Sequence, residues 1–316
     1  MKEIRLVGPE RARDVLAVIR GAFGDRPPLD PPATAMQETE ESVAAALAEH
    51  GGLLGEIDGV PVAALLFHPL DDMLGLRRVG TLPAGRSTGI ARRLVAAAEE
   101  EAARRGYPGL RLIAREELPA TIRFWQRQGY TEAGRSDPQI YLRKLLPLRT
   151  DVPDADATHD LGRRLAGVLR AGDLVILTGD LGAGKTTFTQ GIGAGLGVRG
   201  DVTSPTFVIA RVHQSLDDGP QLVHVDAYRL GGSAELDDLD LDTDLDLAVT
   251  VVEWGEGLAE SLAEDRLAIA LVRAAGDETR TVSITPIGTR WFDAGLVTSL
   301  IHRGPRGNGS AASCQG

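Results

Sequence analysis

The order of apolar and polar positions in the first half of the chain predicts strands alternating with helices. Short apolar runs between turn residues are typical of strands, whereas apolar residues that recur every three or four positions are typical of helices. We expect strands over residues 4–7, 53–57, 62–68, a run toward 82, 110–114 and 139–144. We expect helices over residues 11–23, 39–49, 90–105 and 119–128, with a proline-rich loop over 24–32. This order predicts a mixed α/β domain over residues 1–146.

The second half begins with residues 147–153, whose composition indicates a linker. A helix, a strand over 173–178 and a helix over 185–196 are expected next, followed by strands over 207–211, 222–225 and 248–252. Residues 154–302 are therefore expected to form a second α/β domain with a mixed sheet. Residues 303–316 contain Gly, Ser, Pro and Asn without periodicity, which predicts a disordered tail.

Composition fits two soluble domains. The chain has 316 residues, of which 43% are hydrophobic, which is sufficient for two cores. The first residues do not have the pattern of a signal peptide, and no apolar run is long enough to span a membrane. The only cysteine, Cys314, cannot form an intramolecular disulfide. We therefore expect a cytoplasmic protein that does not contact a membrane.

Charge is distributed unevenly between the two halves. Residues 1–146 contain 20 basic and 20 acidic side chains, and the remainder contains 14 basic and 25 acidic ones, which accounts for the whole net charge of −11. Because phosphate backbones demand basic patches, the second half is a poor nucleic-acid binder on its own. A role in a nucleic-acid pathway would therefore depend on protein partners.

A phosphate-binding loop is the strongest motif. The string from Gly179 to Thr186 fits the P-loop pattern G-x-x-x-x-G-K-S/T between a predicted strand and a predicted helix. In such loops backbone N–H groups surround phosphate, and the helix N-terminus favours negative charge. Lys185 is one of only three lysines in an arginine-rich chain and stands at the motif position that reaches the β- and γ-phosphates. The ATP-binding positions predicted from this loop are Gly179, Asp180, Leu181, Gly182, Ala183, Gly184, Lys185, Thr186 and Thr187.

A P-loop also requires magnesium. The hydroxyl of Thr186 would be one ligand, and a carboxylate at the end of a buried strand would supply or position another. Asp226 and Glu253 both follow apolar runs, and spacing alone does not decide between them. Strand alternation places His224 and Asp226 on one face of their strand and Val225 on the other.

Four strings together resemble one family. Besides the P-loop, they are Ser204-Pro-Thr206-Phe207, His224-Val-Asp226-Ala-Tyr228-Arg229 and Val252-Glu253-Trp254. They resemble the TsaE family, the ATPase component of the bacterial machinery that makes N6-threonylcarbamoyladenosine (t6A) in tRNA. The resemblance covers roughly residues 152–290 and implies slow ATP hydrolysis within a complex of TsaD- and TsaB-like subunits.

The TsaE resemblance also implies roles for individual residues. Lys185 would hold phosphates, and Thr186 and Glu253 would coordinate magnesium. Asp226 would act near the γ-phosphate or its attacking water, and Thr206 would be the sensor in a switch loop. The string Ala157-Thr158-His-Asp-Leu-Gly matches a family string near the nucleotide base, which implies that Thr158 contacts ATP.

An acidic string over residues 235–246 alternates with leucines. It lacks the Gly and the terminal Glu of a calcium-binding EF-hand loop. A solvated face over a packed one is the simpler interpretation.

The first half contains a different small-residue loop, Arg86-Ser87-Thr88-Gly89-Ile90-Ala91, before a long helix. It resembles the pyrophosphate-binding loop of the GNAT family of N-acetyltransferases, and the string from Ala120 to Gly129-Tyr130 resembles a later helix of that family. This resemblance covers roughly residues 2–145 and implies acetyl-CoA binding by those six loop residues.

The chain departs from the GNAT pattern at one position. Trp125 stands where family members often have a tyrosine that serves as the general acid, and an indole N–H is no acid near neutral pH. Tyr130, Tyr141, Tyr107 or solvent could replace it, or the domain could bind CoA without efficient transfer. Glu116 and Glu117 stand where a base could lie, although exposed carboxylates are the simpler interpretation.

The sequence therefore predicts a fusion of an acetyltransferase-like domain and a t6A-pathway ATPase domain. Two alternatives stay open at this point. One is a P-loop kinase of a small metabolite, against which the absence of an arginine-bearing lid segment counts. The other is a nucleotide-gated binding module with a degenerate CoA-binding domain.

Overall fold

The computed structural model describes residues 1–301 except for 206–207, 232–234, 236–245, 274–275 and 277. The chain divides into two compact units, Met1–Leu146 and Pro147–Gly316. The predicted linker over 147–153 is wrong, because Leu148–Val152 forms strand β8 of the second sheet. No helix within the described ranges is long and apolar enough to cross a membrane.

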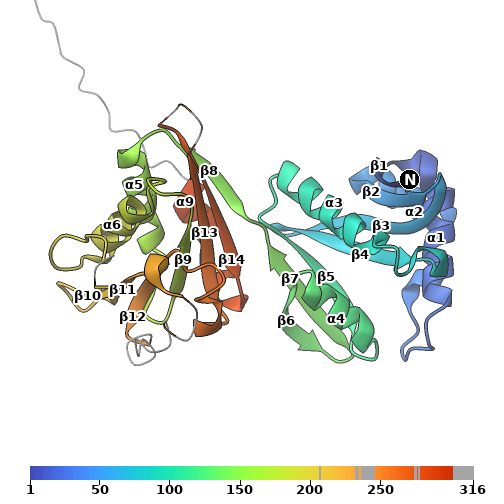
Figure 1. Ribbon diagram of the computed structural model, residues 1–316. Helices are drawn as coiled ribbons and strands as arrows, with labels where there is room; N and C mark the ends of the chain where they lie inside the picture. Colours follow the sequence, from blue (N-terminus) through green and yellow to red (C-terminus); the bar gives the residue numbers. More distant parts are fainter. Residues whose placement is uncertain (206–207, 232–234, 236–245, 274–275, 277, 302–316) are drawn as a thin grey trace, which may run out of the picture. The chain divides into compact units, whose positions relative to one another are not determined.

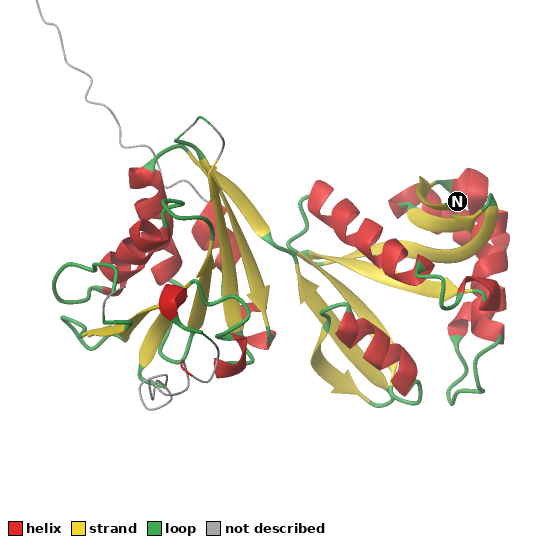
Figure 2. Cartoon of the chain, in the orientation of Figure 1, coloured by secondary structure: helices red, strands yellow, loops and turns green. Residues whose placement is uncertain are grey.

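The first unit is a seven-stranded sheet covered by helices on both faces (Figures 1 and 2). Its strands, in the order β1-β2-β3-β4-β5-β7-β6, are β1 (Lys2–Val7), β2 (Gly52–Ile57), β3 (Val60–Leu70), β4 (Met73–Thr81), β5 (Gly109–Arg115), β6 (Thr131–Ser136) and β7 (Gln139–Leu145). Its helices are α1 (Ala12–Gly24), α2 (Glu40–His50), α3 (Ile90–Arg104) and α4 (Pro119–Arg127). One apolar cluster packs α1 and α2 on one face of the sheet, and a second packs α3 and α4 on the other.

In the middle of the first sheet, the neighbouring strands β4 and β5 pair over only part of their length. β4 and β5 are its one parallel pair and are in register only from Leu74–Leu110 to Leu76–Leu112. β4 continues to Thr81 and β5 to Arg115, and no described residue of these extensions pairs the two strands with each other. The two strands therefore diverge toward their carboxyl ends, beside the start of α3.

The second unit contains another seven-stranded mixed sheet. Its strands, in the order β10-β11-β12-β9-β13-β14-β8, are β8 (Leu148–Val152), β9 (Leu174–Thr178), β10 (Ala210–His213), β11 (Gln221–Asp226), β12 (Ala248–Glu253), β13 (Arg266–Arg273) and β14 (Arg280–Ile287). Its helices are α5 (Ala155–Ala166), α6 (Lys185–Leu196) and α9 (Leu296–Ile301). The central strands β11, β12, β9 and β13 are parallel, so their carboxyl ends meet at one edge of the sheet.

Helix α6 lies very close to α5. A Cβ atom added to Gly191 of α6 would lie 2.0 Å from the carbonyl oxygen of His159, and one added to Gly162 of α5 would lie 2.3 Å from that of Phe188. Backbone therefore meets backbone along this contact, which explains Gly191 and Gly195 in α6. The P-loop is held between this helix pair and the central strand β9.

The mixed α/β class predicted for both halves is confirmed. Most predicted elements agree with the structure to within a few residues, and the predicted helix over 185–196 coincides with α6. β6, β13, β14 and α9 were not predicted, and β10 begins at Ala210 rather than 207. The predicted tail over 303–316 and most of the acidic string lie outside the described residues.

Candidate functional site

The P-loop joins β9 to α6 at the carboxyl edge of the sheet. Gly179, Gly182 and Gly184 have φ angles of 139°, 78° and 103°, a region that L side chains rarely adopt. At Gly179 there is also no space, because a Cβ atom would lie 2.2 Å from the carbonyl oxygen of Leu271 on β13. The loop backbone thus depends on glycine, as phosphate cradles do.

Lys185 is the first residue of α6 and is only 5% exposed. Its ammonium donates to the carbonyl oxygens of Gly179 at 2.7 Å and Asp180 at 3.0 Å, and it lies 3.6 Å from the ring centre of Trp254. Burial lowers the pKa of Lys185, while the nearby carboxylate of Glu253 opposes the shift. The ammonium therefore has uncharged partners, which an anionic phosphate group can replace.

Glu253 ends β12 and is 3% exposed. Its Oε2 accepts from the hydroxyl of Thr186 at 3.1 Å, and its Oε1 lies 2.9 Å from Nε2 of His224 on β11. The next residue, Trp254, has a φ angle of 61°, so the chain turns sharply after the carboxylate. The hydrogen bond between Thr186 and Glu253 thus joins the two side chains that are predicted to be metal ligands.

Asp226 ends β11, directly opposite Glu253 in the parallel register. It accepts hydrogen bonds from the hydroxyl of Ser204 at 3.0 Å and from the backbone N–H of Tyr228 at 3.1 Å. Asp226 is therefore tied to the predicted switch loop, whereas Glu253 is tied to the P-loop. The predicted sensor, Thr206, lies outside the described residues.

These side chains share one cavity of about 370 Å³. It is lined by Leu181, Gly182, Gly184, Lys185, Thr186, Thr187, Ser204, Asp226, Tyr228, Glu253, Trp254 and Arg280. In the part of the chain that the structure describes, no three His, Cys, Asp or Glu side chains form a metal cage. The oxygen donors of Thr186, Asp226 and Glu253 fit Mg²⁺, which takes one or two carboxylates and completes its shell with phosphate and water.

Thr158, which the TsaE resemblance implies as an ATP contact, does not line this cavity. It is completely buried, and its hydroxyl donates to the carbonyl oxygen of Asp154 at 2.8 Å within α5. Thr158 packs behind the P-loop, 3.6 Å from where a Cβ atom of Gly184 would lie. Its contact with ATP stays a prediction.

The sequence analysis did not name Arg280 and Thr189, and it named His224 without assigning it a role. Arg280, at the start of β14, is 7% exposed and donates through Nε to the carbonyl oxygen of Ala183 in the P-loop, 3.1 Å away. His224 of β11 and Thr189 of α6 both lie against Glu253. No local pattern marks Arg280, because strand pairing brings it to the loop from almost 100 positions away.

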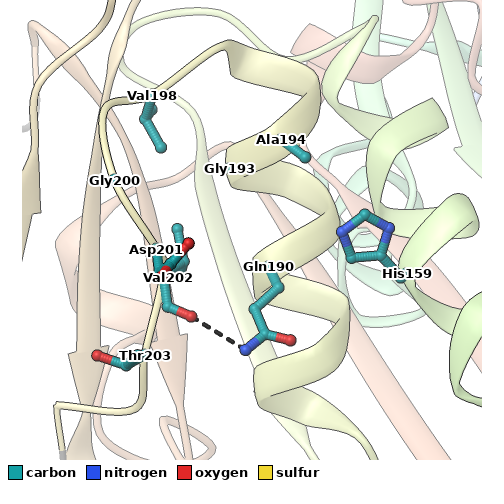
Figure 3. A pocket seen from close by; sticks show the side chains of 9 residues that line it. All are labelled: His159, Gln190, Gly193, Ala194, Val198, Gly200, Asp201, Val202 and Thr203. Carbon is teal, nitrogen blue, oxygen red and sulfur yellow. Dashed lines mark hydrogen bonds between the residues drawn. The ribbon is translucent and has the colours of Figure 1, made fainter.

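A second cavity, of about 470 Å³, lies along α6 (Figure 3). It shares no lining residue with the P-loop cavity and is lined by His159, Gln190, Gly193, Ala194, Val198, Gly200, Asp201, Val202 and Thr203. Across it, the side-chain amide of Gln190 donates to the carbonyl oxygen of Val202 at 3.0 Å (Figure 3). This bond ties the segment that leads to Ser204 to the P-loop helix.

The candidate CoA loop of the first unit leads into α3. Ser87 and Gly89 have left-handed φ angles of 59° and 83°. The hydroxyl of Thr88 donates to the carbonyl oxygen of Gly85 at 2.6 Å and accepts from the N–H of Ile90 at 3.3 Å. The loop therefore leads into the N-terminus of a 15-residue helix, a typical position for an anion, where the N–H of Ile90 is already bound to Thr88.

The remaining two residues predicted to bind acetyl-CoA flank this turn. Arg86 is half-exposed and pairs with Asp25 at 2.5 Å. Ala91 is partly buried within the first turn of α3. The loop also lies next to the diverging ends of β4 and β5, where an extended ligand could reach the sheet backbone.

The structure narrows the choice of general acid in the first unit. Trp125 is 3% exposed and packs edge-on against Tyr130, with 4.9 Å between the ring centres. Burial raises the pKa of Tyr130 well above 10, and its hydroxyl has no hydrogen-bond partner among the described residues. Tyr130 is therefore a core residue and a poor acid, which leaves Tyr141, Tyr107, solvent, or a domain that binds CoA without efficient transfer.

The two carboxylates considered as bases are surface groups. Glu117 pairs with Arg115 at 2.5 Å, and Glu116 is about half-exposed, 4.0 Å from Arg135. Both arrangements match the simpler interpretation of solvated carboxylates.

Comparison with known proteins assigns a family to each unit. Residues 152–282 match the family model "Threonylcarbamoyl adenosine biosynthesis protein TsaE", and residues 20–130 match "Acetyltransferase (GNAT) family". The tRNA threonylcarbamoyladenosine biosynthesis protein TsaE of Streptomyces coelicolor is 66% identical over 140 residues, which are 43% of this chain and 95% of that protein. The protein of the same name from Mycobacterium bovis is 52% identical over 41% of this chain and 81% of that protein.

Among solved structures, the PaiA N-acetyltransferase of Thermoplasma acidophilum in complex with coenzyme A is similar to the first unit. It is 14% identical, covers 46% of this chain and 99% of that one, and has a TM-score of 0.42. Three observations indicate the same family for the second unit. They are the P-loop motif, the cavity that Lys185, Thr186, Asp226 and Glu253 line together, and the two TsaE relatives. The chain therefore belongs to the TsaE family, and its first unit matches the GNAT acetyltransferase family model over residues 20–130.

Proposed function

We propose that the second unit binds ATP with Mg²⁺ in the P-loop cavity and hydrolyses it as the ATPase component of t6A synthesis. The convergence of Lys185, Thr186, Asp226 and Glu253 on this cavity carries the proposal. The TsaE relatives identify the pathway, and the kinase alternative is not favoured.

Each residue receives a role from its position. Lys185 would leave the carbonyl oxygens of Gly179 and Asp180 and hold the β- and γ-phosphates. Thr186 and Glu253 would hold Mg²⁺, which when bound neutralises charge that develops on the phosphates. Asp226 would orient the attacking water, and its bond to Ser204 would couple that water to the predicted switch loop.

We further propose that hydrolysis takes place in a cytoplasmic complex with TsaD- and TsaB-like subunits. The excess of acidic residues in the second half supports contact with tRNA only through those subunits. The exposed side chains of Leu181 and Tyr228 at the mouth of the cavity support a site that a partner covers.

The test measures ATP hydrolysis by the full chain, alone and with the partner subunits, for wild type, Lys185→Ala and Glu253→Ala. Turnover that requires both residues and rises with the partners is expected. A wild type that binds ATP but is no faster than the two variants would identify a nucleotide-gated binding module instead.

For the first unit we propose acetyl-CoA-dependent N-acetylation of an amine. The divergence of β4 and β5 beside the turn at Gly89 supports it, because the turn offers N–H groups to an anion and the opening offers backbone to an extended ligand. Calorimetric binding of acetyl-CoA tests the cofactor site, and release of free CoA from acetyl-CoA in the presence of an amine tests the transfer. Arg86→Ala is expected to weaken binding, whereas Arg13→Ala, at an exposed arginine of α1 on the opposite face of the sheet from α3, is the matched control.

A further inference from the structure

Glu253 is a buried carboxylate whose two oxygens have different partners. Oε2 accepts from Thr186 on the P-loop side, and Oε1 faces His224 at 2.9 Å. We propose that His224 is a positioning residue that holds Oε1 and thereby turns Oε2 toward the metal position. The proposal rests on the proposed function of the second unit.

Strand register explains why His224 can reach this carboxylate. His224 lies on β11 opposite Val251 of β12, and Asp226 lies opposite Glu253. Residues two apart on a strand share a face, so His224, Asp226 and Glu253 all face α6. His224 thus reaches diagonally to the neighbouring strand, from a position with 0% exposure.

Thr189 is the other group near Oε1, at 3.5 Å. Its hydroxyl has one proton, and that hydroxyl already donates to the carbonyl oxygen of Lys185 at the shorter distance of 3.0 Å. Among the described residues His224 is therefore the group left to donate to Oε1. Without it, one oxygen of a buried carboxylate would lose its donor, which is costly.

The geometry indicates a holding role rather than proton transfer. An ionised carboxylate only accepts, so Nε2 of His224 carries the proton in this bond. Nδ1 is buried and has no hydrogen-bond partner in the described part of the chain, so the ring has no route along which to pass a proton. The bond fixes the direction of the Glu253 carboxylate.

Direction matters because Mg²⁺ demands near-ideal octahedral geometry. The hydroxyl of Thr186 is itself a proposed ligand, so its present bond to Oε2 is available for exchange when the metal enters. The bond from His224 lies on the opposite oxygen and persists. Loss of such outer partners typically lowers metal affinity about 10–100-fold.

The experiment measures binding of a fluorescent ATP analogue by the full chain, in EDTA and across a Mg²⁺ titration. His224→Leu removes the donor and keeps an apolar volume. His224→Gln places an amide N–H near the position of Nε2. The side chain of His224→Asn is shorter, so its amide N–H does not reach Oε1 of Glu253. Thr250→Val is the matched control, because Thr250 is a buried residue of β12 whose hydroxyl has no partner among the described residues.

His224→Leu and His224→Asn are expected to raise the Mg²⁺ midpoint about 10–100-fold, with unchanged affinity in EDTA. His224→Gln should recover most of the wild-type midpoint, and Thr250→Val should match wild type. If His224→Leu does not fold, the comparison of Gln with Asn decides.

Two results would overturn the inference alone. One is a Mg²⁺ midpoint equal to that of wild type in His224→Leu and His224→Asn. The other is a Mg²⁺ midpoint of His224→Gln that is as high as that of His224→Asn. A wild type whose nucleotide binding does not depend on Mg²⁺ would overturn the proposed function itself, and the two failures are therefore distinguishable.

Discussion

Gly191 of the P-loop helix tests whether the contact between α5 and α6 is as close as the structure shows. Helix propensity alone predicts that Gly191→Ala stabilises the second unit by about 1 kcal/mol. The structure predicts the opposite sign, because the added Cβ atom would lie 2.0 Å from the carbonyl oxygen of His159. Real Cβ contacts essentially never fall below 3.0 Å, so the helices would have to separate by about 1 Å.

The size of the effect follows from what must move. The obstructing atoms are backbone, at 2.0 and 2.9 Å in His159 and 3.0 Å in Arg163, and they cannot rotate away. A gap of 0.5–1 Å loses roughly a quarter to a half of each van der Waals contact across it. Overpacking typically costs about 1–3 kcal/mol, and a backbone clash belongs at the upper end of that range. Subtracting the gain in propensity leaves an expected net loss of about 2 kcal/mol.

Urea denaturation followed by tryptophan fluorescence measures this change, because Trp254 and Trp291 report on the second unit. Ala194→Gly is the matched control. Ala194 is exposed on the same helix, so that variant reports helix propensity alone and should lose about 1 kcal/mol. A Gly191→Ala variant more stable than wild type, beside an Ala194→Gly variant less stable by a similar amount, would refute the close contact.

Three further outcomes follow from particular side chains. Tyr130→Phe should leave stability unchanged or raise it by about 1 kcal/mol in thermal denaturation, because the buried hydroxyl has no partner among the described residues; a clear loss would reveal one. Hydrogen bonds from Arg104 lower the pKa of Glu101 to about 2 from 4.5, so the stability that its charge contributes is complete above pH 4.5 and is lost as the pH falls toward 2. Urea titrations at pH 7 and pH 3 should therefore show a smaller acid loss for Glu101→Gln than for wild type, and equal losses would contradict this. ATP should change the fluorescence of Trp254 as the ammonium of Lys185 leaves its ring, and Lys185→Met should abolish the change; an identical response in both proteins would argue against that movement.

Local signals in the sequence predicted much of the phosphate site. Gly179 and Gly184 indicate a tight turn between a strand and a helix. The helix predicted after this turn is α6, from Lys185 to Leu196. Asp226 and Glu253 were both named because each ends an apolar strand. The choice between them depends on contacts, and the structure ties Glu253 to the P-loop and Asp226 to Ser204.

What the sequence did not predict depends on pairing between distant segments. Arg280 reaches the P-loop only because β14 pairs with β13, and His224 reaches Glu253 only in the parallel register of β11 and β12. The burial of Thr158 was likewise not predictable, because its motif match is local whereas its burial depends on how α5 packs. The segment 148–152 is short and largely polar, so its sequence does not indicate a strand. It forms β8 because it pairs with β14.

That partner strand has a practical consequence for separating the two units. β7 ends at Leu145 and β8 begins at Leu148, so only Leu146 and Pro147 connect the sheet of one unit to that of the other. A truncation that begins after residue 153 would strip β8 and expose the backbone of β14, a row of unpaired N–H and C=O groups that favours aggregation. The natural outer strand instead carries Arg149 and Asp151, charges of the kind that protect sheet edges. A soluble ATPase fragment should therefore begin at Pro147.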